Sequence, residues 1–201
     1  MTWMPSVFGK PIELLKPRAD QVDFSAMAHA LANVNRYGGH AQTPVSVGLH
    51  VLIGCDIAPE ALRPWWLLHD GHEERMGDTA SPVKETYSAL ATEMYGPEVS
   101  SMLTRVRLEF ERRHDAVIHQ AAGLPLPTDE QKREIRRIDL IALATEKRDF
   151  HAEQTRPWFT DLHGIQPAKR IYRWKPPVVV ADELYRRFRK YLPSLSTRHV
   201  A

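Results

Sequence analysis

The chain has 201 residues, enough for one domain with a sizeable hydrophobic core. Hydrophobic residues at 43% and charged residues at 26% are ordinary values for a soluble globular protein, and a formal net charge of +2 is too small to indicate non-specific nucleic-acid binding. The single cysteine, Cys55, excludes an internal disulfide and fits a reducing compartment. No stretch approaches the ~20 apolar residues of a membrane span, and no signal-peptide pattern opens the chain. We therefore expect a cytoplasmic protein without a membrane partner.

The expected elements are almost all helices. Residues 1–22 contain prolines and a glycine with little periodicity, and they predict an irregular N-terminal arm. Apolar residues then recur at the three- and four-residue spacing of amphipathic helices. The expected helices cover residues 23–36, 45–57, 60–75, 82–95, 98–124, 129–150 and 182–191. A run of three valines at 178–180 is the main strand-like signal, so the fold class predicted is all-α.

Two of these helices carry specific signals. Thr128 with Gln131 resembles a capping box at the start of the 129–150 helix. The 98–124 helix has apolar residues at the spacing expected of a core-facing stripe, namely Val99, Met102, Leu103, Val106 and Phe110. We expect a single-domain bundle with a helical core over 23–156, followed by a C-terminal extension over 157–201 whose terminal helix packs on the core.

Four side chains have the chemistry of a metal site: His50, the adjacent pair His69 and Asp70, and Asp139. The pair follows a largely apolar run, and Asp139 lies beside the apolar stripe of its own helix, where an unpartnered carboxylate is costly. Two imidazoles and two carboxylates suit a borderline divalent metal and leave room for water. A His-Asp pair alone is better explained by chance or by a buried hydrogen bond than by a metal site. Its combination with an upstream histidine and a downstream aspartate favours a metal site.

Further charged residues surround the His-Asp pair in the sequence. Glu73 should share the helical face of the pair, where a second carboxylate could perform acid/base chemistry. Asp78 could point back into the same pocket. Arg36 offers a planar fork and Lys84 a point charge for a phosphate group.

Three other features give weaker evidence for a functional role. Glu146 lies seven residues beyond Asp139 and could reach the pocket, although a solvated or salt-bridged helix end is the preferred interpretation. His72 is expected to point away from the metal and to be solvated. The basic, aromatic-containing segment 186–191 could contact nucleic acid, yet a surface helix with an apolar stripe explains it adequately.

The whole pattern resembles the HD-domain metal-dependent phosphohydrolases: His, then His-Asp with Glu three residues later, then Gly-Asp, Pro-Val-Lys and a distant Asp. Within them it is most similar to the small subgroup of bacterial 5′-deoxynucleotidases and phage deoxynucleotide triphosphohydrolases. The segments that carry this likeness are 28–31 (Ala-His-Ala-Leu), 36–40 (Arg-Tyr-Gly-Gly-His) and 46–50 (Ser-Val-Gly-Leu-His). The likeness spans roughly residues 23–150 and implies an HD-type helical bundle.

The resemblance implies a single divalent metal ion, which could be Zn, Mn, Co, Fe, Ni or Mg. Its implied ligands are His50, His69, Asp70 and Asp139. Members of the family with two metals supply extra histidines after the His-Asp pair, and this chain has none between His72 and His114.

The resemblance also implies roles for five other residues. Glu73 and Asp78 match the acid/base and water-positioning carboxylates, and Arg36 matches an arginine that holds the substrate phosphate. Lys84 matches a lysine of the loop, and Tyr37 stands where some relatives have tryptophan beside the sugar.

The function expected from the resemblance is hydrolysis of a small-molecule nucleotide, a deoxynucleoside mono- or triphosphate, by metal-activated water attack on phosphorus. Two alternatives stay open: a non-catalytic module that binds or senses nucleotides, and a phosphodiesterase acting on a cyclic or oligonucleotide. Relatives pair as homodimers, and an apolar helix face could serve that purpose here. Nucleic acid is not an expected partner.

Overall fold

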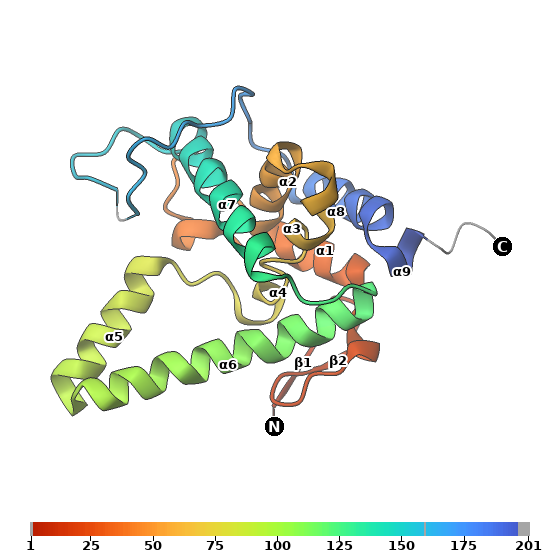
Figure 1. Ribbon diagram of the computed structural model, residues 1–201, viewed down its shortest axis with the longest axis horizontal. Coiled ribbons are helices and arrows are strands. Elements are labelled where there is room, and N and C mark those ends of the chain that lie inside the picture. Colours follow the sequence, from red (N-terminus) through yellow and green to blue (C-terminus); the bar gives the residue numbers. More distant parts are fainter. Residues whose placement is uncertain (1, 159, 197–201) are drawn as a thin grey trace.

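The computed structural model describes residues 2–158 and 160–196, and Figure 1 shows their arrangement. Helices dominate these residues, which confirms the all-α prediction. The α-helices are α1 (Phe24–Asn33), α2 (Val47–Ile57), α3 (Arg63–Trp66), α4 (Glu73–Met76), α5 (Ser81–Tyr95), α6 (Pro97–Ala122), α7 (Asp129–Phe150), α8 (Pro177–Tyr191) and α9 (Pro193–Ser196). Short 3-10 helices are η1 (Ala19–Gln21), η2 (Arg36–Gly39) and η3 (Glu60–Leu62).

The N-terminal arm is more ordered than the sequence indicates. Strands β1 (Trp3–Pro5) and β2 (Pro11–Glu13) pair in antiparallel fashion, with Met4 opposite Ile12. Three-residue strands are too short to show a recognisable alternation, which is why the sequence pattern did not reveal them. The arm is anchored beyond the hairpin, where the His114 Nε2–H on α6 donates to the carbonyl of Leu14 over 2.9 Å.

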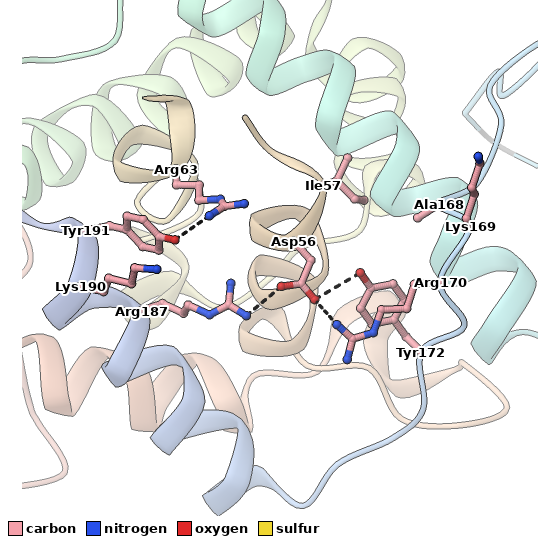
Figure 2. Close-up of a pocket in the computed structure, with 10 residues that line it drawn as sticks. All are labelled: Asp56, Ile57, Arg63, Ala168, Lys169, Arg170, Tyr172, Arg187, Lys190 and Tyr191. Carbon is pink, nitrogen blue, oxygen red and sulfur yellow. Dashed lines mark hydrogen bonds and ion pairs between the residues drawn. The ribbon is translucent and has the colours of Figure 1, made fainter. Parts of the chain in front are cut away.

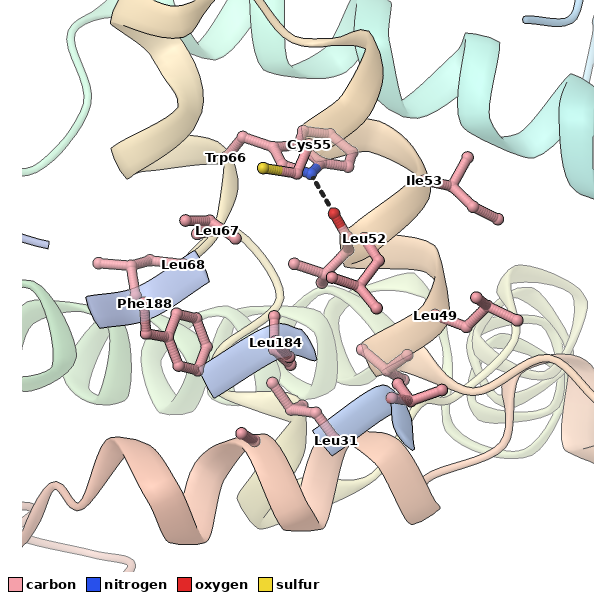
Figure 3. Close-up of a cluster of buried hydrophobic side chains, with 14 of the residues drawn as sticks. Leu31, Leu49, Leu52, Ile53, Cys55, Trp66, Leu67, Leu68, Leu184 and Phe188 are labelled. Atoms are coloured by element: carbon pink, nitrogen blue, oxygen red, sulfur yellow. Dashed lines mark hydrogen bonds between the residues drawn. The ribbon is translucent and has the colours of Figure 1, made fainter. Parts of the chain in front are cut away.

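The hydrophobic core surrounds α2 (Figure 3). Every residue of α2 from Val47 to Cys55 is buried, as expected for a helix that is apolar on all sides. Figure 3 shows Leu31 of α1 and Leu184 and Phe188 of α8 in the same cluster. The indole of Trp66 packs so closely on α2 that a Cβ at Gly54 would come within 1.9 Å of its ring. This contact fixes the chain just before His69 against the helix that carries His50.

Helices α5 and α6 form a long hairpin that projects from the rest of the structure (Figure 1). Four residues of the stripe expected to face the core are exposed here, with exposed fractions from 39% for Val99 to 69% for Val106, whereas Phe110 is half-buried and its ring contacts His114. That prediction was wrong, because periodicity reveals an apolar face but not what covers it. Helix α5 packs against α6, and none of the α5 residues is buried.

Two helix boundaries illustrate the local signals. The capping box at Thr128 and Gln131 is confirmed. Helix α8 begins five residues earlier than expected, with Pro177 in its first turn, so the valine run 178–180 is helical and Val180 is buried. The last positions of the expected extension, 197–201, lie outside the described residues. Among the helices of the described part, none is both long and apolar enough to cross a membrane.

Candidate metal centre

The His-Asp pair does not lie on a regular helix, contrary to the expected 60–75 helix. The chain forms η3 and α3, passes through a series of turns over 67–72, and then forms α4. In these turns the hydrogen bonds span three residues: the His69 N–H donates to the Trp66 carbonyl, and the Gly71 N–H donates to the Leu68 carbonyl. Such turns are tighter than an α-helix. They bring the adjacent side chains of His69 and Asp70 together, with His69 Nε2 only 3.1 Å from Asp70 Oδ2.

The predicted ligands converge from three parts of the fold. His50 Nε2 on α2 lies 3.4 Å from His69 Nε2 and 3.5 Å from Asp139 Oδ1 on α7. One ligand atom from each of these three residues lies within 4.8 Å of the others, so the group could hold a metal ion. Asp70 approaches the same group, with its Oδ2 3.6 Å from His50 Nε2. Bonds of ~2.0–2.2 Å to one metal place neighbouring ligand atoms roughly 3.0–3.6 Å apart, which matches these distances.

Hydrogen bonds on the far side of each imidazole determine which nitrogen faces the group. The His69 Nδ1 lies 2.7 Å from the carbonyl oxygen of Trp66, which can only accept, so Nδ1 carries the hydrogen. His50 Nδ1 donates in the same way to Glu146 Oε1 over 2.6 Å. When both imidazoles are neutral, both Nε2 atoms are then bare and face each other, an arrangement that a cation between them, a proton or a metal ion, would stabilise.

Glu146 is the principal site residue that sequence reasoning missed. It is completely buried, whereas a solvated or salt-bridged helix end was the preferred interpretation. Its carboxylate accepts hydrogen bonds from His50, from Arg36 Nε over 3.2 Å and from the Tyr37 hydroxyl. Burial acts to raise the pKa of the Glu146 carboxyl, but the positive charges of Arg36 and His50 outweigh this effect and lower the pKa to about 2. Its position seven residues beyond Asp139 was the available signal.

Tyr37 is held in an unusual backbone conformation. Its φ angle of 59° lies in the left-handed region, which costs on the order of 1–3 kcal/mol for a residue other than glycine. The side chain contacts His151, with 4.5 Å between the ring centroids. Burial and the adjacent Glu146 carboxylate raise the pKa of the Tyr37 hydroxyl, so it stays protonated and donates to Glu146. Conformational strain is therefore located beside the candidate metal centre.

A cavity of about 170 Å³ opens beside the ligand group. It brings together most of the polar residues that the sequence pointed to. These lining residues are Arg36, Tyr37, Asp70, Glu73, Asp78, Lys84 and Asp139. Arg136 also lines it and was not foreseen; its Nη1 lies 2.6 Å from Asp139 Oδ2, which leaves Oδ1 facing His50.

Acidic and basic side chains line the cavity together, and its acidic groups are perturbed by burial. Burial and the neighbouring Asp70 and Asp78 raise the pKa of the Glu73 carboxyl to about 10. Burial also raises the pKa of Asp78. The Oε2 atom of Glu73 is buried without a hydrogen-bond partner in the described part of the chain. Asp70 and Asp139 line the cavity and also approach His50 Nε2, so a bound cation would lie at the edge of the cavity where these two carboxylates meet the imidazoles.

His72 contacts helix α6 rather than solvent, so the expectation that it is solvated was wrong. Its Nδ1 lies 2.9 Å from Asp115 Oδ1, and its side chain is 13% exposed. Burial lowers the pKa of His72, but the Asp115 carboxylate outweighs this effect and raises it overall. His72 thus ties the turns after the ligand pair to α6.

Comparison with known proteins gives relatives but no activity. The chain is 27% identical over 176 residues to the uncharacterized protein YfdR of Escherichia coli, an alignment covering 88% of this chain and 86% of YfdR. It is also 27% identical over 191 residues to an uncharacterized protein of Rhodobacter capsulatus, covering 89% of this chain and 83% of that protein. No family model matches the chain. The chain is therefore similar along nearly its whole length to two bacterial proteins whose names assign no function.

Proposed function

We propose that the chain is an HD-type metal-dependent phosphohydrolase acting on nucleotides, with deoxynucleoside mono- or triphosphates as substrates. The observation that supports this proposal most strongly is the pair of Nε2 atoms converging with carboxylate oxygens from two other positions. In the proposal His50, His69, Asp70 and Asp139 hold one divalent ion. A divalent ion there would polarise a phosphoryl oxygen and lower the pKa of an adjacent water.

The cavity residues supply the remaining chemistry in this proposal. Arg36 is 12% exposed and lies 3.8 Å from Asp70, so its guanidinium can contact a phosphate next to the ligand group. Lys84 also lines the cavity and adds a second positive charge. Both Arg36 and Lys84 would offset negative charge on the non-bridging oxygens of the substrate phosphate. Glu73, with its raised pKa, keeps a proton that it can donate to the leaving oxygen, and Asp78 would orient the attacking water.

The size of the cavity limits how the substrate can lie. At about 170 Å³ it is smaller than the roughly 300–1,000 Å³ of pockets that enclose a drug-sized ligand. In the proposal, therefore, the phosphate and the adjoining part of the sugar enter the cavity and the base stays outside. This arrangement predicts weak selection among the four bases and stronger selection for the sugar.

A non-catalytic nucleotide sensor would need the cations of the cavity but not Glu73. A buried carboxyl without a hydrogen-bond partner costs on the order of 1–3 kcal/mol, and a sensor gains nothing from it. Its presence therefore favours the enzyme over the sensor.

The test is release of phosphate, pyrophosphate or triphosphate from a panel of ribo- and deoxynucleoside mono- and triphosphates. Each substrate is incubated with Mn²⁺, Co²⁺, Zn²⁺ or EDTA, and the Glu73→Gln variant is run beside the wild type. Metal-dependent release that Glu73→Gln abolishes would support the proposal and identify the leaving group. No release from a protein shown to bind metal would indicate the sensor.

A homodimer remains part of the proposal. Exposed apolar residues gather on the projecting α5–α6 hairpin, including Tyr87, Met94, Met102 and Val106. Light scattering of the purified protein distinguishes a mass near 23 kDa from one twice as large.

A further inference from the structure

A second pocket lies apart from the metal centre, between the end of α2, the start of α3, the segment 168–172 and α8 (Figure 2). Its volume is about 740 Å³. Figure 2 shows basic side chains on both sides of it and a single acidic one between them. The charged residues of its lining are Arg63, Lys169, Arg170, Arg187, Lys190 and Asp56.

The charges of this pocket do not balance. Asp56 is shared by two arginines: its Oδ2 lies 2.7 Å from Arg170 Nη1, and its Oδ1 lies 2.8 Å from Arg187 Nη2. Within the described residues, Arg63, Lys169 and Lys190 have no carboxylate partner. Five cations against one carboxylate leave an excess of positive charge around one hollow. Such a site attracts anions with several charges.

Two of the arginines are already fixed in place. Arg63 donates from Nη1 to the Tyr191 hydroxyl over 2.6 Å and from Nε to the Ala58 carbonyl over 3.2 Å. Arg187 is held by Asp56 and by Cys55 Sγ, 3.2 Å from its Nη1. A ligand would not have to order these guanidinium groups, so less conformational entropy is lost on binding. Guanidinium groups bind the oxygens of phosphate through paired donors, which favours an oxyanion such as phosphate over a simple halide.

We propose that this pocket binds a small-molecule polyphosphate of nucleotide size. The volume of about 740 Å³ falls within the roughly 300–1,000 Å³ typical of small-ligand sites, and it is several times that of the metal-centre cavity. The ligand is either a free nucleoside di- or triphosphate or an inorganic polyphosphate, since both present the same chain of phosphates. The basic segment 186–191 of α8 then has a role as one wall of this site.

The walls of the pocket belong to elements that also carry the candidate metal ligands. Asp56 follows His50 by six residues on α2, and Arg63 precedes His69 by six. The segment 168–172 is tied to α7, because the Ala168 N–H donates to Thr145 Oγ1, next to Glu146. If the proposed hydrolysis is correct, a ligand here can affect it through these shared elements. The binding itself does not depend on that function.

Calorimetric titration in EDTA tests the binding without a metal at the first site. The probes are sodium tripolyphosphate, ATP, adenosine and a single-stranded oligonucleotide, in a buffer free of phosphate. The variant is Lys169→Gln/Lys190→Gln, both exposed and without a carboxylate partner in the described residues, so the fold should persist. Its matched control is Lys10→Gln/Lys16→Gln, which removes the same charge from the exposed N-terminal arm.

We expect tripolyphosphate and ATP to bind the wild type and the control equally, and to bind the pocket variant at least tenfold more weakly, whereas adenosine does not bind. Similar affinities for ATP and tripolyphosphate would point to the phosphate chain as the recognised group; tighter ATP binding would point to a nucleotide. Absence of binding, equal losses in variant and control, or stronger binding of the oligonucleotide would overturn the proposal. Failure of the nucleotide hydrolysis panel would leave this titration unaffected.

Discussion

The variant Glu146→Gln isolates the contribution of one buried carboxylate to the candidate metal centre. In the wild type this carboxylate accepts hydrogen bonds from His50, Arg36 and Tyr37. Glutamine keeps the size of the side chain but loses the charge, and its NH₂ group donates where the carboxylate accepted. His50 then faces either a neutral amide oxygen or the NH₂ group, so the charged acceptor that keeps the hydrogen on Nδ1 and leaves Nε2 free for a metal is weakened or lost.

The expected loss follows from the kind of contact. Removing a hydrogen-bond partner behind a metal-binding histidine typically lowers metal affinity 10- to 100-fold. Hydrogen bonds to charged groups contribute ~1.5–3 kcal/mol each. Because the substitution weakens the bonds to the Glu146 carboxylate without removing all of them, the unfolding free energy should fall by about 2 kcal/mol. For a chain of this length that corresponds to a decrease of about 4–8 °C in Tm.

The assay is competition for Zn²⁺ or Mn²⁺ against a chelating dye, with thermal unfolding measured on the same samples. Glu134→Gln is the matched control, because Glu134 lies on the same helix but forms an exposed pair with Arg137. We expect weaker metal binding only for Glu146→Gln. A lower Tm with unchanged metal affinity would refute the reasoning, because Glu146 would then stabilise the fold without orienting His50.

Three further outcomes follow from the site and its surroundings. Glu73→Gln should retain the metal and lose at least 100-fold in kcat, measured by metal content and by steady-state kinetics; a kcat within twofold of wild type would remove Glu73 from the mechanism. Arg36→Lys keeps a positive charge but loses the planar fork, so KM should rise about tenfold with kcat largely retained, and an effect on kcat alone would argue against phosphate binding in the ground state. His114, held between Arg75 and the carbonyl of Leu14, has its pKa lowered by burial to about 4. In the unfolded chain, the His114 imidazole takes up a proton near pH 6.5, whereas in the folded chain it does so only near pH 4. The unfolding free energy should therefore fall by at most about 3 kcal/mol from pH 6.5 to 4. His114→Gln should remove this part of the pH dependence in urea unfolding, and an unchanged pH dependence in that variant would contradict the assignment to His114.

The sequence predicted most of the helices, because each of these is marked by its own apolar periodicity, and some also by local caps; the expected 60–75 helix is the exception. Thr128 with Gln131 is a signal complete within four residues, and the structure contains the capping box it predicts. The ligand group was also within reach of sequence reasoning, since histidine and aspartate at costly apolar positions need a partner. His50, His69 and Asp139 indeed meet at one point.

The features that the sequence did not predict depend on which elements pack against one another in the fold. Periodicity placed Glu146 on the face of Asp139, but the residues that bury it, Arg36 and Tyr37, come from a turn about 110 positions earlier. The break of the 60–75 helix arises from hydrogen bonds that tighten the turns and from the packing of Trp66 against α2. The basic pocket is likewise invisible in the sequence, because Arg63 and Arg187 meet only after α8 folds back onto the core.

The central claim is that one divalent ion, held by His50, His69 and Asp139 together with Asp70, enables phosphate release from a nucleotide. It is tested most directly by measuring phosphate release as a function of bound metal, with the metal added stepwise to chelator-treated protein. The account predicts that release rises in proportion to bound metal, reaches its maximum at one ion per chain, and is absent in Asp139→Asn, which should also fail to bind the ion. Full release from the metal-free protein, or from Asp139→Asn, would contradict it.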